Sequence, residues 1–580
     1  MGQKKLSLFL SPHSRISRHI VQYNRGILQI GRDCEGGDFL TSRGFVRGAM
    51  VLGVAAILSK LLGSIYTILL QNLIGDSGMG IYQMAYPIYA TLLIISTAGF
   101  PVAVSKFVSE HTALGDYQGA HKIYRVSLLL LSIVGFMAMV VLYVGADFFA
   151  KISGDPRAVY AIRAISPALF IVPAMSSVRG YFQGWQMMNP TAISQVVEQL
   201  VRVLTILIGA YVVLSFGFGD SIAAAAAAFG AVSGGLAGLA VMGFFLWHYR
   251  RLAGFDQVAK PSNGQTPRLT TMSIVKRLVY YAIPVSLGAL IVPLISNVDA
   301  LTVTNLLKGH GMAQSLATRE FGILTGRAFK LMMFPAALAS AIGAALMPSV
   351  SEAFALRATR DTAARVLMGL RIIVFFSLPA AVGLFLLAKP IDITLFKDAA
   401  GYHSIQIIGI ATFFSALQIA LAASLQGIGA VYLPVRSLAV GTLLKIALNL
   451  ALVPPFGIDG AAMATVVSYA VASILNLVSL SRLLHLRLSV NDYLLKPAIA
   501  TIPMGAFVFA VSSQWQRLAL HLEQRLSAAG VTVISVFIGV LVYMIMLVLL
   551  GALRENEVAA VPKVGQTLVR TFRRMGLFAR

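Results

Sequence analysis

The chain has 580 residues, of which 58% are hydrophobic and only 12% are charged. Soluble globular proteins usually carry about 25% charged residues, so this composition excludes an ordinary cytosolic enzyme, a disordered protein and a coiled coil. Apolar runs of about 20 residues recur along most of the length, and each is long enough to span a bilayer as a helix. The sequence therefore predicts an all-α polytopic membrane protein.

Basic residues dominate the charge, with 46 Lys and Arg against 22 Asp and Glu and a formal net charge of +24. They gather at the ends of apolar segments, a placement that orients membrane helices and does not indicate nucleic-acid binding. Cys34 is the single cysteine, which excludes an intrachain disulfide and a thiolate metal site. We find no Walker loop and no metal signature, so we expect neither a cofactor nor a bound metal.

The apolar segments divide the chain into two bundles joined by a polar linker. We expect a basic tail over 1–42, an N-lobe over 43–247, a cytoplasmic linker over 248–278 and a C-lobe over 279–484. Two further helices fall in 485–555, before a basic tail over 556–580. The fourteen predicted spans are 48–74, 81–108, 126–149, 158–182, 192–214, 221–247, 279–307, 324–350, 366–387, 402–427, 434–453, 460–484, 497–513 and 531–553.

The distribution of Lys and Arg predicts the orientation. With the N-terminus inside, roughly 31 basic residues lie on the cytoplasmic side and about 9 lie in the outer loops. Both termini are then cytoplasmic, as an even number of spans requires.

Short motifs recur at a separation of about 240 residues, which indicates an internal duplication. The matching pairs are Ser109-Glu110 with Ser351-Glu352, Gln183-Gly184 with Gln426-Gly427, Pro190 with Pro434, Arg202 with Lys445, and Asp220 with Asp459. Each copy holds six spans, an even number, so the two lobes share one orientation and form a parallel repeat. Transporters commonly place their substrate between such repeats.

Several segments resemble a known family. They are Leu58-Ser59-Lys60-Leu61-Leu62-Gly63, Gly80-Ile81-Tyr82-Gln83, Gly99-Phe100-Pro101, Arg179-Gly180-Tyr181-Phe182-Gln183-Gly184 and Glu198-Gln199-Leu200-Val201-Arg202. Together they resemble the polysaccharide-transporter branch of the multidrug/oligosaccharidyl-lipid/polysaccharide exporter superfamily. Within it they are most similar to the subgroup of stage V sporulation protein B and the lipid II flippases.

This resemblance covers residues 43–555 and implies two six-helix lobes around a central cavity that opens alternately to either side. The implied cargo is an undecaprenyl-linked sugar that crosses from the inner to the outer leaflet. The chain departs from the subgroup at Thr67, where members often carry a basic residue, and in its basic tail over 1–42.

Charges inside the predicted spans are the candidate site residues, because a charge in hydrocarbon costs about 2.5–3.5 kcal/mol on insertion scales. Lys60 lies mid-helix at a position where the resemblance implies a basic, cavity-lining residue. Arg327 and Lys330 share one face at the start of span 8, where the resemblance implies a contact with the substrate pyrophosphate. The alternatives are a snorkelling lysine at position 60 and surface anchors at 327 and 330.

Two further groups of intramembrane charge are predicted. Glu198 and Arg202 lie at i and i+4, where an internal salt bridge that neutralises both is favoured over a role in the transport pathway. Asp299 and Lys445, with Asn449 one turn from Lys445, lack charged partners on their own helices and belong to one lobe. They form either a structural ion pair or a site at which Lys445 replaces a coupling cation as a tethered charge.

We therefore expect a flippase of the bacterial plasma membrane that carries an undecaprenyl-pyrophosphate-linked oligosaccharide, first of all lipid II, and acts as a monomer without nucleic acid. The alternatives are export of another lipid-linked glycan, of capsule, teichoic or spore-cortex type, and cation-coupled export of small molecules. A membrane glycosyltransferase is disfavoured because the predicted outer loops are short. A scaffold protein is disfavoured because it needs no intramembrane charge.

Overall fold

The computed structural model describes residues 42–253, 270–486, 489, 491–513 and 523–553. These residues form helices joined by short turns, without a strand among them. The predicted tails therefore lie almost wholly outside the described residues. The polar linker is shorter than predicted, because flanking helices extend to Ala253 on one side and begin at Thr271 on the other.

The N-lobe is built from nine consecutive helical elements. They are α2 (Ser42–Thr97), α3 (Phe100–Ala113), α4 (Tyr117–Val144), α5 (Ala146–Ile152), η1 (Pro156–Ala158), α6 (Val159–Ile165), α7 (Ala168–Gly184), α8 (Met188–Ser215) and α9 (Asp220–Ala253). Gly75 breaks α2 with φ 70° and ψ 178°, a conformation that glycine adopts readily because it lacks a Cβ. The predicted first and second spans therefore meet at Gly75.

The C-lobe repeats this pattern. It comprises α10 (Thr271–Ala289), α11 (Ile291–Gly309), α12 (Gln314–Gly322), η2 (Ile323–Ala328), α13 (Phe329–Ala355), α14 (Thr359–Leu386), α15 (Ala388–Phe396), α16 (Tyr402–Gly427) and α17 (Tyr432–Leu484). A break at Gly457, with φ 60°, divides α17 into two segments. The final elements are η3 (Asn491–Leu495), α18 (Lys496–Ser513) and α20 (Gln524–Leu549).

Backbone conformation supports the duplication inferred from the sequence. Residues with positive φ recur about 240 positions apart at the ends of corresponding helices. The pairs are Gly115 with Arg357, Gly154 with Lys397, Gln186 with Gly429, and Gly217 with Gly457. The helices α4 and α14, which follow the first of these pairs, each contain 28 residues.

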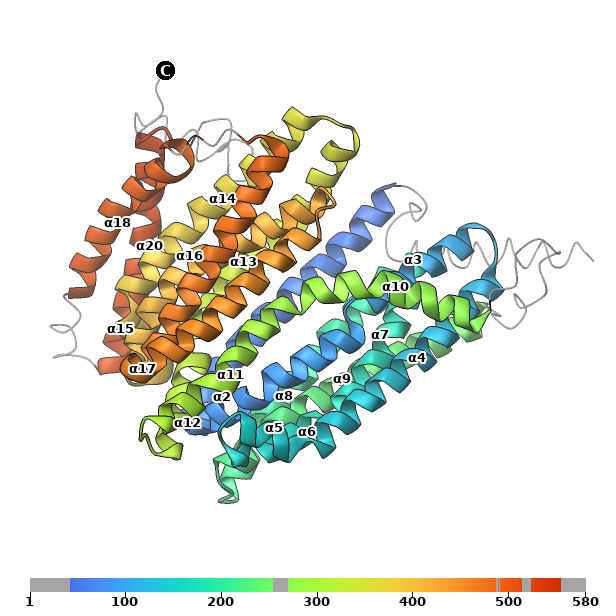
Figure 1. Ribbon diagram of the computed structural model, residues 1–580, viewed down its shortest axis with the longest axis horizontal. Coiled ribbons are helices and arrows are strands. Elements are labelled where there is room, and N and C mark those ends of the chain that lie inside the picture. Colours follow the sequence, from blue (N-terminus) through green and yellow to red (C-terminus); the bar gives the residue numbers. More distant parts are fainter. Residues whose placement is uncertain (1–41, 254–269, 487–488, 490, 514–522, 554–580) are drawn as a thin grey trace, which may run out of the picture.

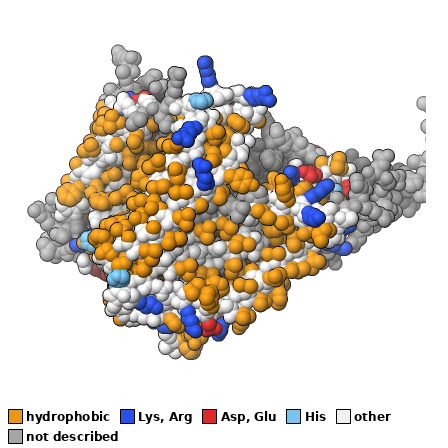
Figure 2. All heavy atoms as spheres, in the orientation of Figure 1, with side chains coloured by type: hydrophobic (Ala, Val, Ile, Leu, Met, Phe, Trp, Pro, Cys, Tyr) orange, Lys and Arg blue, Asp and Glu red, His pale blue; other side chains and the backbone are white. Residues whose placement is uncertain are grey.

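The surface of the described helices suits a bilayer. Hydrophobic side chains cover most of the visible face, with Lys and Arg toward its edges (Figure 2). Eleven helical stretches of the described chain are long and apolar enough to cross a membrane, and one of them, at 53 residues, contains the break at Gly457. The protein is thus a helical polytopic membrane protein, and the count of fourteen spans stays a prediction.

The two lobes converge at one end of the molecule. Their helices meet around α12, α15 and the break in α2, and splay apart toward the opposite end, which carries α3, α10 and the α13–α14 turn (Figure 1). We call the first of these the convergent end. At this end Gly80 and Gly322 let the lobes touch through their backbones: a Cβ on Gly80 would lie 2.1 Å from the Thr318 oxygen, and one on Gly322 would lie 1.9 Å from the Asp76 oxygen.

Candidate functional site

Arg327 lies at the convergent end and joins the two lobes. It belongs to η2, a π-helical turn of the kind often found at functional sites, and is only 2% exposed. Its Nε and Nη2 donate to the two carboxylate oxygens of Asp76 in the N-lobe, at 3.0 and 2.7 Å. Its Nη1 donates to Asp392 of α15 at 3.1 Å and to Asp398 of the following loop at 2.5 Å. The guanidinium predicted to bind substrate is thus already paired with three carboxylates.

The carboxylates of this cluster differ in their environments. Asp392 and Asp398 lie between two candidate membrane spans. Burial raises the pKa of Asp392 to about 6, even though Arg327 and the Gly401 N–H favour its charged form. Burial also acts to raise the pKa of Asp398, but hydrogen bonds from Arg327 and from the Ala400 N–H outweigh it and hold that pKa below its usual value.

A second set of contacts strengthens the convergent end. The Thr318 hydroxyl donates to Asp155 at 2.7 Å, and Lys308 Nζ donates to the Gly154 oxygen at 2.5 Å. The Gln71 amide donates to the Gly322 oxygen at 3.3 Å. Each of these bonds joins one lobe to the other, so separating the lobes here would break several buried polar contacts together.

Lys330 lies one turn beyond Arg327 in α13, in a different electrostatic environment. It is half-buried, and its Nζ lies 6.0 Å from the centre of the Tyr86 ring in the N-lobe. Within the described ranges, no carboxylate lies within ion-pair distance of this Nζ. A partly desolvated cation that no carboxylate neutralises can attract an anion strongly.

Tyr86 belongs to a row of tyrosines along the second half of α2. Its ring stacks on Tyr82, and its centre lies 6.0 Å from that of Tyr89. The hydroxyls of Tyr66 and Tyr82 are 3.3 Å apart, which joins the two halves of α2 across the break at Gly75. Tyr82 and Tyr89 are buried in the core, and Tyr86 is the member of this tyrosine row whose ring faces Lys330.

The N-lobe contains the predicted pair on α8, with a third member. Arg202 Nη2 donates to Glu198 Oε1 at 2.6 Å, and Arg179 Nη2 of α7 donates to Glu198 Oε2 at 2.9 Å. The helix presents these side chains inward, because Leu200, Leu204 and Ile208 form an exposed apolar stripe on its other face. The predicted mutual neutralisation of Glu198 and Arg202 is therefore incomplete: two cations share one carboxylate and leave one positive charge.

The predicted residues of the C-lobe lie together. Lys445 Nζ of α17 donates to Asp299 Oδ2 of α11 at 2.5 Å, and both side chains are fully buried. Asn449 donates to Asp299 Oδ1 at 3.0 Å and to the Thr302 hydroxyl at 2.9 Å. The cluster is compact and electrically neutral, and whether it takes part in coupling stays a prediction.

The remaining predicted site residue is Lys60. Its backbone lies in the first half of α2, and its side chain lies outside the described part of the structure. Its predicted contact with substrate is therefore not tested by the geometry.

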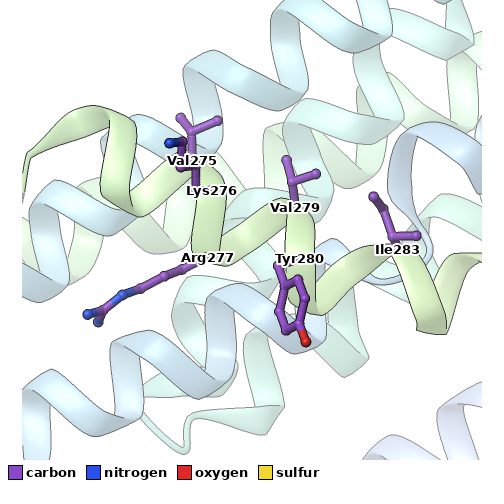
Figure 3. A pocket seen from close by; sticks show the side chains of 6 residues that line it. All are labelled: Val275, Lys276, Arg277, Val279, Tyr280 and Ile283. Carbon is purple, nitrogen blue, oxygen red and sulfur yellow. The ribbon is translucent and has the colours of Figure 1, made fainter.

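A surface groove of about 620 Å³ runs along α10 (Figure 3). It is lined by Val275, Lys276, Arg277, Val279, Tyr280 and Ile283, and it includes none of the predicted site residues. Tyr280 is 84% exposed, which shows how open the groove is. In the described part of the chain, no group of three or more His, Cys, Asp or Glu side chains is arranged to hold a metal ion.

Sequence reasoning missed the partners of the predicted cations. Asp76, Asp392 and Asp398 stand at the ends of apolar segments and were not linked to Arg327, and Arg179 was noted only within a motif. One signal was available: with 22 acidic residues in the whole chain, each acid beside an apolar segment is a candidate partner for a buried base. Which acid meets which base depends on the packing of helices that lie hundreds of residues apart in the sequence.

Two helical lobes that meet through buried, oppositely charged side chains are typical of membrane transporters built from repeated helical bundles. The family model described as "Polysaccharide biosynthesis protein" matches residues 45–354. The chain belongs to this family, and its curated relatives include flippases and not enzymes.

Two curated relatives come from Bacillus subtilis (strain 168). The lipid II flippase MurJ is 32% identical over 520 residues, covering 86% of this chain and 94% of the relative. Stage V sporulation protein B is 27% identical over 531 residues, covering 91% and 99%.

Two solved structures share the fold. A lipid II flippase MurJ in an inward closed conformation gives a TM-score of 0.61 at 14% identity, covering 86% of this chain and 98% of that structure. An inward-facing multidrug resistance transporter of the MATE family gives 0.60 at 17% identity, covering 74% and 94%.

Proposed function

We propose that the protein is a flippase that moves an undecaprenyl-pyrophosphate-linked oligosaccharide, with lipid II as the first candidate, across the bacterial plasma membrane. The observation that carries the proposal is Lys330, a half-buried cation that has no carboxylate partner among the described residues and lies beside Tyr86 of the tyrosine row between the lobes. A fixed cation attracts a pyrophosphate more strongly in such a site than in water. The partly exposed ring of Tyr86 offers a flat apolar face for the sugar. The relationship to a lipid II flippase supports this choice of cargo.

The contacts at the convergent end support a role for Arg327 that differs from direct substrate binding. With the N-terminus inside, the convergent end faces outward, so the structure corresponds to a state closed to the outside. Arg327 then holds Asp76 of the N-lobe against Asp392 and Asp398 of the C-lobe. Transport requires these contacts to open so that the headgroup can leave on the outer side, while Lys330, and Lys60 as a proposed partner, hold the pyrophosphate.

The neutral Asp299–Lys445 pair supports a C-lobe in which the ammonium occupies the place of a coupling cation. The cluster has no unmatched charge and no exposed side chain, so transport is expected to need no sodium. We also expect the protein to act as a monomer.

The cargo is tested by rescue of a bacterial strain depleted of its lipid II flippase, together with detection of lipid II in the outer leaflet. We expect the wild type and Lys330→Arg to rescue growth, and Lys330→Gln to fail while reaching the membrane in normal amounts. Lys60→Ala is expected to fail and Lys60→Arg to rescue. Arg365→Gln, which alters an ion pair within one lobe, is the matched control and should rescue.

The possible outcomes separate the cargo from the mechanism. If the wild type fails where a known flippase succeeds, another lipid-linked glycan becomes the first candidate cargo. If the wild type rescues and Lys330→Gln rescues equally well, the cationic site is refuted.

Orientation is tested by reporter fusions. A fusion after Arg268 should report the cytoplasm and one after Asp398 should report the outside, because the Lys and Arg asymmetry places the linker inside. The reverse result would mean that Arg327 closes the cytoplasmic end.

A further inference from the structure

The N-lobe triad of Arg179, Glu198 and Arg202 contains one positive charge that the proposed function does not yet use. Its two cations are not equivalent. Arg179 donates to Glu198 and also to the Ser194 hydroxyl, at 2.9 and 2.7 Å. Arg202 donates to Glu198 through Nη2, while its Nε is buried and has no hydrogen-bond partner among the described residues. Arg202 is therefore the cation with unused donor capacity.

A purely structural role does not explain the surplus charge. A single Arg–Glu pair is neutral and would let the helices insert, whereas a further cation inside a membrane helix costs about 2.5–3.5 kcal/mol on insertion scales. Asp299 and Lys445 show that this chain can build a neutral pair, fully buried, in the other lobe. The side chain of Arg202 is instead 19% exposed, so it remains open to a ligand.

The surroundings of Arg202 connect it to Lys330. Helix α8 packs against α2, and its residues Val203 and Ile206 belong to the same core cluster as the tyrosine row. Tyr86 in turn is the ring that faces the Lys330 ammonium. One row of aromatic side chains thus has a cation from the N-lobe and a cation from the C-lobe as neighbours, at the boundary that an alternating-access cycle must open and close.

We propose that Arg202 is the second cation of the headgroup site and that, together with Lys330, it selects a lipid diphosphate over a lipid monophosphate. A guanidinium can bind phosphate oxygens through two parallel hydrogen bonds, and the guanidinium of Arg202 uses only Nη2 for Glu198 while its side chain is partly exposed. Lys330 acts as a point charge on the same anion. This inference rests on the proposed function in that its ligand is a polyprenyl pyrophosphate, and it holds for any sugar attached to that group.

The experiment measures binding of two sugar-free probes, undecaprenyl pyrophosphate and undecaprenyl phosphate, to the full-length protein in nanodiscs. The wild type is expected to prefer the pyrophosphate by at least tenfold. Arg202→Gln keeps the neutral Arg179–Glu198 pair, and we expect it to lose most of that preference. Lys330→Gln should weaken binding of both lipids. Arg163→Gln, which removes an exposed guanidinium paired with Asp147 in the same lobe, is the control and should bind like the wild type.

Glu198→Gln provides a change in the opposite direction and guards against misfolding of Arg202→Gln. Removing the carboxylate doubles the surplus charge of the triad, so pyrophosphate binding should tighten by several-fold. A merely structural triad predicts no gain.

One result overturns the assignment of Arg202 and retains the proposed function. In it, the wild type binds the pyrophosphate and Lys330→Gln weakens this binding, but Arg202→Gln and Glu198→Gln bind like the wild type. A wild type that does not bind the pyrophosphate overturns the proposed function and this assignment together.

Discussion

Arg202 of α8 and Lys445 of α17 occupy matching places in the two lobes, yet their environments differ. Lys445 has Asp299 to itself, and the exposed fraction of both side chains is zero. Arg202 shares Glu198 with Arg179, and the three side chains are 12–19% exposed. Both lobes have a base at this position with one carboxylate beside it, but in the N-lobe a second base shares that carboxylate.

The two groups therefore differ in charge balance: one is a sealed neutral pair and the other is a partly exposed group with a surplus positive charge. A neutral, fully desolvated pair offers no net attraction to an anion, whereas a partly exposed group with one surplus positive charge does. Arg327 between the lobes is a third case, since three carboxylates surround it and, even with Arg319 at 3.8 Å from Asp76, leave the cluster negative. A base in a membrane helix is therefore interpretable only together with its acids.

The largest effect is expected at the sealed pair. Asp299→Asn or Lys445→Gln alone leaves one uncompensated buried charge, which typically costs about 3–5 kcal/mol. The double variant removes both charges and should cost less than either single change. Thermal unfolding of the purified protein and the amount inserted in membranes measure this. A double variant no more stable than the single ones would show that the two charges do not depend on each other.

The cluster between the lobes should respond by a change of conformation. Arg327→Ala leaves Asp76, Asp392 and Asp398 without their shared cation, so the convergent end should open, with a shift of about tenfold or more in the equilibrium. Gly322→Ala should open the convergent end as well, because the new Cβ would overlap the backbone carbonyl oxygen of Asp76.

Opening can be measured as a loss of disulfide crosslinking between cysteines introduced at Asn72 and Leu395, which are in contact across the lobes, in a Cys34→Ser background. Arg365→Ala changes ion pairs within the C-lobe and should leave the crosslinking yield unchanged. Equal yields in all variants would contradict the closing role of Arg327.

A smaller effect on stability is expected in the N-lobe. Arg202→Gln removes only the surplus charge and leaves Arg179 paired with Glu198, so the free energy of unfolding should change by about 1 kcal/mol or less. This variant is the direct counterpart of Lys445→Gln, and the two should differ clearly in thermal unfolding. Similar losses of stability in the two variants would mean that folding depends on Arg202 as much as on Lys445. The proposed difference between the two lobes would then be wrong.

The smallest effect concerns pH at the convergent end. The pKa of Asp392 is raised to about 6, so the folded state binds a proton more readily than the unfolded chain, and this group adds stability as pH falls from 7 toward 5. The lowered pKa of Asp398 acts oppositely, and its contribution is lost only below about pH 4. Asp392→Asn should remove the change in thermal stability between pH 7 and 5. An unchanged profile in that variant would assign the effect to another group.

The sequence alone determined the membrane class, the helical architecture, the duplication and the family, because these follow from local properties. Apolar run length, helix-end charge and repeated motifs such as Gln183-Gly184 and Gln426-Gly427 are readable without knowing any contact. The positions of intramembrane bases such as Arg202, Lys330 and Lys445 were also evident, since a charge in an apolar run stands out.

Only the tertiary structure decided what those bases do, because the sign of a site depends on acids brought in from other helices. Arg327 meets Asp76 from 251 positions away, and Lys445 meets Asp299 from 146. Lys330, three residues beyond Arg327, has no such partner among the described residues. Helix periodicity puts Arg327 and Lys330 on one face of the helix. The break at Gly75 and the turn after α15, however, bring the three carboxylates against Arg327 and not against Lys330.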